Sequence, residues 1–224
     1  MEHLNTELQL LKADIIEMWN LVINQLAKAK DIIDNCDSGL ANDIKANEKR
    51  VDAFELKIDM DCENILALFN PLANDLRFVL AILKINYNLE RIGDYAKGIA
   101  KTISEAEKEF DKESIKEAKI HEMFEVALKM LTDALESFEN ENNKLVRTVF
   151  KTDEKLDKVN KNANTIIADL IKRKPENIKN HLNLLTIIRK LERVGDQTKN
   201  IAEEIIFYIE AKILRHSKKK NIKQ

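Results

Sequence analysis

The chain has 224 residues, a length that allows one large domain or two small ones. Its 34% of charged residues, 5% of aromatic residues, 4 Gly and 2 Pro are typical of long helices with solvated outer faces, not of a sheet. A net charge of −2 argues against nucleic acid as a partner, and no apolar run approaches the ~18 residues of a membrane span or resembles a secretory signal. We therefore expect a soluble, cytoplasmic, all-helical protein.

Apolar residues recur at helical spacing through six long segments. In the first half they predict helices over residues 5–36 and 41–69, with a break at Ser38-Gly39. A third helix is expected to follow, with Asn70 as its N-cap and Pro71 at its first position. In the second half they predict helices over residues 113–142, 145–172 and 176–214. The basic residues 215–224 are expected to form a frayed tail.

The two halves of the sequence repeat each other. Residues 88–103 and 190–205 share nine identities in sixteen positions, including Leu-Glu-Arg-x-Gly-Asp. Residues 48–59 align with residues 153–164, and a proline follows each of these two segments. Because short connections make neighbouring helices antiparallel, the repeat predicts an all-α fold, a tandem pseudo-symmetric pair of three-helix bundles with six long antiparallel helices. The expected division is into residues 1–110 and 111–224.

Acidic residues take equivalent places on the second and third helices of each copy. Glu48 and Asp94 each lie twenty-three residues from Pro71, and Asp52 and Glu90 each lie nineteen residues from it. Because a helix rises ~1.5 Å per residue, equal counts place each pair level on facing helices. The same arrangement around Pro175, to within one residue, is made by Asp153, Asp157, Glu192 and Asp196.

Carboxylates collected this closely repel one another and need protons or a cation. Hard or borderline metal ions bridged by carboxylate oxygens are one way to meet this need. The other is a solvated face on which basic residues such as Lys97 and Lys199 pair with the acids. Gly93 and Gly195 lie between the acids although glycine costs ~1 kcal/mol inside a helix, which indicates either the close approach of a neighbour or a simple packing notch.

These features resemble the PhoU family of phosphate-regulon accessory proteins. The resemblance covers nearly the whole chain. It rests on Leu-Glu-Arg-x-Gly-Asp in both halves, on Asn-Pro-x-Ala-x-Asp-Leu-Arg at residues 70–77, and on the acidic pattern of the second helix. The segments Glu-Met-Trp and Ala-Phe-Glu-Leu-Lys-Ile-Asp resemble members of the family from the Bacteroidetes lineage.

The resemblance implies two three-helix bundles whose Glu/Asp-x-x-x-Asp motifs hold multinuclear metal clusters. Iron is the first candidate, and zinc, manganese, magnesium and nickel are the others. The resemblance also implies a homodimeric regulator without catalytic activity, which negatively couples the ATPase subunit of a phosphate ABC transporter to a phosphate-sensing histidine kinase. Neither nucleic acid nor membrane insertion is expected.

Transferred to this sequence, the resemblance implies two sets of metal ligands. In the first bundle the ligands are Glu48, Asp52, Glu55, Asp59, Glu90 and Asp94. In the second bundle they are Asp153, Asp157, Glu192 and Asp196. The second bundle has Asn160 and Asn164 in the places of Glu55 and Asp59, so its site is expected to hold fewer or weaker metals.

Two other functions remain open at this point. A carboxylate-bridged cluster could activate water in a metal-dependent hydrolytic enzyme, although no histidine follows a Glu at the spacing of di-iron enzymes. Alternatively, the acids could stay metal-free on a plain helical scaffold. His121 or His181 would be the acceptor in a phosphotransfer bundle, but an ordinary exposed helix histidine is the expected role. Cys36 and Cys62 are expected to be buried free thiols.

Overall fold

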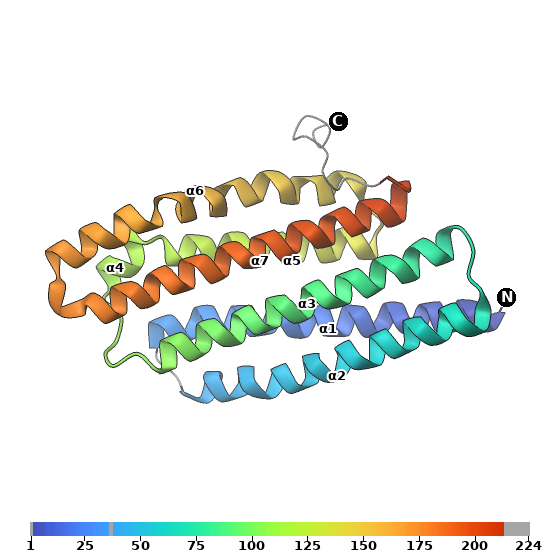
Figure 1. Ribbon diagram of the computed structural model, residues 1–224, viewed down its shortest axis with the longest axis horizontal. Coiled ribbons are helices and arrows are strands. Elements are labelled where there is room, and N and C mark those ends of the chain that lie inside the picture. Colours follow the sequence, from blue (N-terminus) through green and yellow to red (C-terminus); the bar gives the residue numbers. More distant parts are fainter. Residues whose placement is uncertain (1, 36–37, 213–224) are drawn as a thin grey trace.

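The structure is a computed structural model that describes residues 2–35 and 38–212. Over these residues it contains helices and no strand: α1 (Glu2–Asn35), α2 (Ser38–Phe69), α3 (Asn74–Ser104), α4 (Lys112–Glu117), α5 (Ile120–Glu139), α6 (Asn143–Arg173), the 3-10 turn η1 (Pro175–Asn177) and α7 (Ile178–Glu210). Figure 1 shows α1–α3 and α4–α7 as two bundles lying side by side. The expected tandem pair of helical bundles is confirmed. None of the helices in the described ranges is long and apolar enough to cross a membrane.

One continuous cluster of buried apolar side chains holds all the long helices together. Each of α1, α2 and α3 packs on the other two, and α5, α6 and α7 do the same. Met18 and Trp19 lie fully buried in this core, and so does the free thiol of Cys62. The expectation of an exposed histidine is wrong for His181, which is fully buried with its Nε2 3.2 Å from Ser114 Oγ. Cys36 and the expected basic tail lie outside the described residues. Because the core passes from one bundle into the other, the division at residue 110 stays a prediction.

Helices α3 and α7 form the seam between the bundles and run antiparallel (Figure 1). The amide of Asn200 donates to Asn88 Oδ1 at 3.2 Å, and the side chain of Lys190 lies against Gly98. These two contacts are copies of each other, because the repeat aligns residue 88 with 190 and residue 98 with 200. The seam therefore has an approximate twofold axis.

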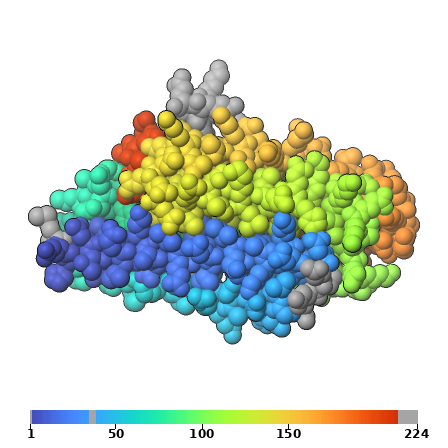
Figure 2. Space-filling view, turned by 180° about the vertical axis from the view of Figure 1, so that it is seen from behind, coloured from blue at the N-terminus to red at the C-terminus, as the bar shows by residue number. Residues whose placement is uncertain are grey.

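On the opposite face, α1 packs against α5. Figure 2 shows the blue residues of α1 running along the yellow-green residues of α5. Lys30 and Glu125 join these helices by an ion pair of 3.1 Å. The acidic segments lie on other helices, α2, α3, α6 and α7, and take no part in this α1–α5 contact.

Two predicted boundaries in the first bundle are wrong. Helix α2 already begins at Ser38, so Gly39 lies inside it and does not mark the break. Helix α3 begins at Asn74 rather than at Pro71. The intervening turn holds Asn70 at a positive φ of 45°, a conformation that asparagine tolerates better than most residues, so Asn70 belongs to the turn and does not cap α3.

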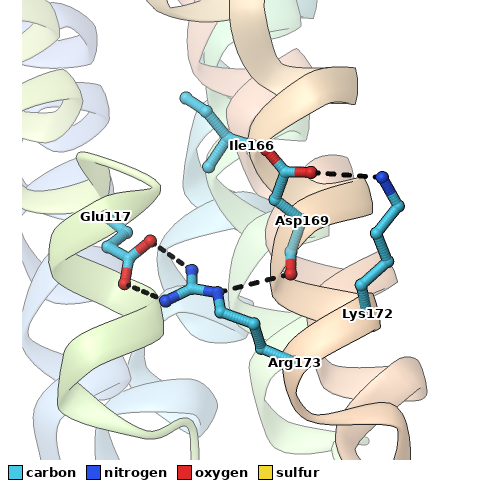
Figure 3. A pocket seen from close by; sticks show the side chains of 5 residues that line it. All are labelled: Glu117, Ile166, Asp169, Lys172 and Arg173. Carbon is cyan, nitrogen blue, oxygen red and sulfur yellow. Dashed lines mark hydrogen bonds and ion pairs between the residues drawn. The ribbon is translucent and has the colours of Figure 1, made fainter.

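The helix predicted over residues 113–142 is in fact two helices. Helix α4 ends at Glu117 and α5 begins at Ile120, because Lys119 adopts the left-handed conformation with a φ of 57°. Figure 3 shows one interaction that fixes α4 in place: the guanidinium of Arg173 on α6 binds both carboxylate oxygens of Glu117, at 3.0 and 2.5 Å. No glycine or proline marks this break, so tertiary packing overrides the local helical preference.

Asp111 fixes the beginning of α4. Its Oδ1 accepts hydrogen bonds from the backbone N–H of Ser114 at 3.0 Å and from the ammonium of Lys174 at 3.1 Å. Burial opposes the charged form, but these bonds outweigh burial and lower the pKa of Asp111 to about 2. A carboxyl whose pKa is lower in the folded than in the unfolded chain stabilises the fold above the unfolded-state pKa, and this contribution is lost as the pH falls through the folded-state pKa.

We predict that Asp111→Ala lowers the free energy of unfolding by about 1–2 kcal/mol at pH 7, as the loss of an N-cap does. The difference from the wild type should shrink between about pH 4 and pH 2, and the partial exposure of Asp111 limits this pH-dependent part to about 1 kcal/mol. Urea unfolding across this pH range measures both effects. Asp43→Ala removes an exposed ion pair with Lys28 and is the matched control, with an expected change below about 0.5 kcal/mol. A loss for Asp111→Ala that does not depend on pH would contradict the assignment.

Candidate metal centre

Six carboxylates lie along the facing sides of α2 and α3. We call them the first strip: Glu48, Asp52, Glu55 and Asp59 on α2, and Glu90 and Asp94 on α3. The carboxyl groups of Glu48 and Asp94 are in contact, as their equal distance from Pro71 predicts. Glu90 lies close to Asp94 and Glu55, while Asp52, its expected level partner, acts on Glu55. All six side chains therefore belong to one acidic surface.

Burial and mutual repulsion act on the middle of the first strip. Burial raises the pKa of Glu90 to about 7, and the charges of Asp94 and Glu55 add to the effect. Burial also raises the pKa of Glu55, with further contributions from Asp59, Asp52 and Asp94. Burial is the larger cause of these shifts and the neighbouring negative charges are the smaller one, and a bound cation would offset the second.

The two ends of the first strip have their own partners. At one end, Lys97 Nζ lies 3.0 Å from Glu48 Oε1 and 3.8 Å from Asp94 Oδ1. Glu48 is only 4% exposed, and its other oxygen is buried with no hydrogen-bond partner among the described residues. At the other end, Asn86 donates to Asp59 at 2.9 Å. No sequence signal indicates Asn86, because the repeat has an isoleucine in its place.

The second strip consists of Asp153 and Asp157 on α6 and of Glu192 and Asp196 on α7. Lys199 Nζ lies between two of these acids, 2.5 Å from Asp153 Oδ2 and 2.9 Å from Asp196 Oδ1. Burial raises the pKa of Asp153 to about 6, although Lys199 acts in the opposite direction. Burial and Asp196 also raise the pKa of Glu192, while a hydrogen bond with Asn160 lowers it in part.

The two glycines accommodate different neighbours. A Cβ at Gly195 would lie 2.6 Å from Asp153 Oδ1 and 2.6 Å from Leu156 Cδ1. At Gly93 the nearest atom is Gln25 Oε1 at 3.1 Å. Of the two alternatives, a packing notch describes Gly93, which lies against Gln25 and Val51, whereas at Gly195 a carboxylate of the second strip approaches closely.

Comparison with known proteins identifies the family. The family model described as the PhoU domain matches residues 15–103 and again residues 120–205. The chain belongs to the PhoU family. It is 34% identical over 206 residues to the "phosphate-specific transport system accessory protein PhoU homolog 1" of Thermotoga maritima, which covers 92% of this chain and 88% of that protein. The resemblance found in the sequence is thus confirmed.

Solved structures of PhoU proteins have the same fold. The crystal structure of PhoU from Pseudomonas aeruginosa matches with a TM-score of 0.84 at 29% identity, over 93% of this chain and 99% of that chain. The phosphate transport system regulatory protein PhoU from Streptococcus pneumoniae matches with a TM-score of 0.80 at 27% identity, over 94% of this chain and 98% of that chain. The tandem pair of bundles is therefore the fold of these PhoU structures.

The two strips of this PhoU chain differ in how well they suit a metal. Within residues 2–35 and 38–212, no three His, Cys, Asp or Glu side chains stand together as ready ligands of one ion. The first strip nevertheless supplies carboxylate oxygens and excess negative charge, which fit a hard cation once side chains turn toward it. In the second strip Lys199 already supplies positive charge, and Asn160 and Asn164 replace two acids, so these residues do not fit a multinuclear cluster. The ligand sets stay a prediction.

We predict that Gly195→Ala lowers the free energy of unfolding by about 1–3 kcal/mol, because the new methyl group overlaps a buried carboxylate and Leu156. Gly98→Ala is the matched control. There the nearest atom is the flexible end of Lys190, so the replacement should be neutral or stabilise by up to about 1 kcal/mol. Thermal or urea unfolding of both variants measures the difference. Equal effects at the two positions would show that Asp153 does not occupy the space beside Gly195.

Proposed function

We propose that this chain is a non-catalytic accessory and regulatory protein of a phosphate transport system. The match of both halves to the PhoU domain carries this proposal. The names of similar proteins support it, since one is a phosphate-specific transport system accessory protein and another a phosphate transport system regulatory protein. The chain acts in the cytoplasm as a homodimer and negatively couples the ATPase subunit of a phosphate ABC transporter to a sensor histidine kinase.

The first strip is the metal-binding part of this function. Glu48, Asp52, Glu55, Asp59, Glu90 and Asp94 hold the metal, with iron as the first candidate and zinc, manganese, magnesium or nickel as the others. The gathering of Glu55, Glu90 and Asp94 supports this role, because neighbouring negative charges add to burial in raising the pKa of Glu55 and Glu90. A bound cation supplies that charge and joins α2 to α3. The side chains of this chain then hold the two helices in the state that partners bind.

Exposed apolar side chains flank the first strip. Leu56 is 70% exposed and Met60 is 57% exposed, and each directly follows an acid of the strip in the sequence. In the second bundle the repeat has Lys161 and Thr165 at these positions. Exposed apolar side chains beside a polar surface are typical of protein–protein contacts. The partner contact is therefore proposed for the first bundle.

The metal role predicts that Glu90→Gln/Asp94→Asn removes most of the bound metal. Elemental analysis of protein purified without chelator and without a metal-affinity step measures the metal content. Glu122→Gln/Glu125→Gln on α5 is the matched control, because it removes two acids that lie outside both strips. Equal metal content in the wild type and in Glu90→Gln/Asp94→Asn would reject the first strip as the site.

The regulatory role predicts that deleting the protein raises phosphate-regulon expression under high phosphate. The wild-type chain should co-purify with the transporter's ATPase subunit, and Leu56→Ser/Met60→Ser should weaken both co-purification and repression. Ile178→Ser/Leu182→Ser, which changes two exposed apolar residues of α7, is the control and should behave as the wild type. Unchanged regulon output in the deletion strain would reject the regulatory role. Wild-type co-purification and repression by the Leu56→Ser/Met60→Ser variant would reject only the contact surface.

A further inference from the structure

We propose that Lys199 is a built-in cation that takes the place of a metal ion in the second strip, so that metal binding is confined to the first strip. This inference rests on the proposed metal role of the first strip. Its own evidence is the set of contacts around Lys199, which neither the family match nor the names of related proteins describe.

The ammonium of Lys199 joins the two helices in the way a bridging cation would. It lies 2.5 Å from Asp153 Oδ2 on α6 and 2.9 Å from Asp196 Oδ1 on α7. The Asp153 side chain is only 3% exposed and that of Lys199 is 27% exposed. An ion that entered this end of the strip would have to displace an ammonium group that is paired with two carboxylates, one of them buried, before it reached either of them.

Gly195 leaves the space that lets the Asp153 carboxylate lie between the helices, where Lys199 reaches it. The Asp153 carboxylate lies where a side chain at position 195 would be, so it sits deep between the helices rather than at their outer edge. Its second oxygen is buried and has no hydrogen-bond partner among residues 2–35 and 38–212. The long side chain of Lys199 is therefore the cation that serves this buried carboxylate.

The equivalent lysine of the first strip is held more loosely. Lys97 makes one short contact, 3.0 Å to Glu48, while Asp94 is 3.8 Å away. Its side chain is 47% exposed, against 27% for Lys199. Glu48 and Asp153 are both buried, so the difference lies in the lysines: Lys199 bridges two carboxylates, whereas Lys97 makes one short ion pair and is more exposed, so a cation displaces Lys97 at a smaller loss of contacts.

The arginine of the repeated motif is also used differently in the two bundles. Arg193 lies 3.3 Å from Asp196 and 3.7 Å from Glu192, so it adds a second positive charge to the second strip. The equivalent Arg91 instead lies over the ring of Tyr87, at 5.9 Å from its centroid. Four acids paired with two cations thus compare with six acids that have Lys97 and the charge of Arg91 nearby, so the first strip keeps the larger excess of negative charge.

Mn²⁺ titration of the full-length chain tests this inference. The background is Glu90→Gln/Asp94→Asn, which disables the first strip. We expect this background to bind no Mn²⁺ tightly, and the addition of Lys199→Gln to create about one Mn²⁺ site per chain. Electron paramagnetic resonance of free Mn²⁺ counts the bound ions. The new site should disappear when Asp196→Asn is added, and Lys155→Gln, an exposed lysine on α6, should create none.

Two results would overturn the inference. One is a background protein that already binds Mn²⁺ and loses it on Asp153→Asn/Asp196→Asn, and the other is a folded Lys199→Gln variant that gains no ion. If Lys199→Gln fails to fold, the double variant Asp153→Asn/Lys199→Gln should restore folding, because it removes both charges of the pair. A double variant that also fails to fold would show that Lys199 is not the counter-cation. Wild-type protein without metal in its first strip would reject the proposed metal role of that strip, and the Lys199 result would be unaffected.

Discussion

Burial of a carboxylate between two packed helices is the constraint on which the rest of the site depends. Such a group loses several kcal/mol of hydration and needs a positive charge or hydrogen bonds in return. Glu48 and Asp153 occupy equivalent places in the two bundles, and both are buried with one oxygen lacking a partner among the described residues. A lysine of the next helix, Lys97 or Lys199, supplies the charge in each case. The two bundles differ in the number of short ion pairs that this lysine makes, one for Lys97 and two for Lys199.

The duplicated fold gives this difference a physical meaning. The approximate twofold axis at the α3–α7 seam places the two strips in equivalent positions on one continuous core. A single molecule therefore contains one strip in which a lysine bridges two acids and one in which the equivalent lysine makes a single short ion pair. Across the seam, Lys84 and Glu204 form an ion pair of 2.8 Å that ties α3 to α7.

The sequence predicts the architecture well, because the repeat, the apolar spacing and the short connections leave few other arrangements. Counting from Pro71 also brings Glu48 and Asp94 together correctly. The break at Lys119 could not be predicted, since no local residue marks it and distant packing imposes it. The pairing of Lys199 with the acids is one of the two alternatives that the sequence leaves open, but the sequence does not reveal that its partner Asp153 is buried between the helices.

The missing side chain at position 195 also constrains how this protein can change over generations. The carboxylate of Asp153 fills the space that any larger residue there would require. A larger residue at position 195 therefore costs stability as long as the acid keeps this place. The two positions are expected to vary together among descendants of this chain, with a bulkier residue at one accompanied by loss of the acid at the other.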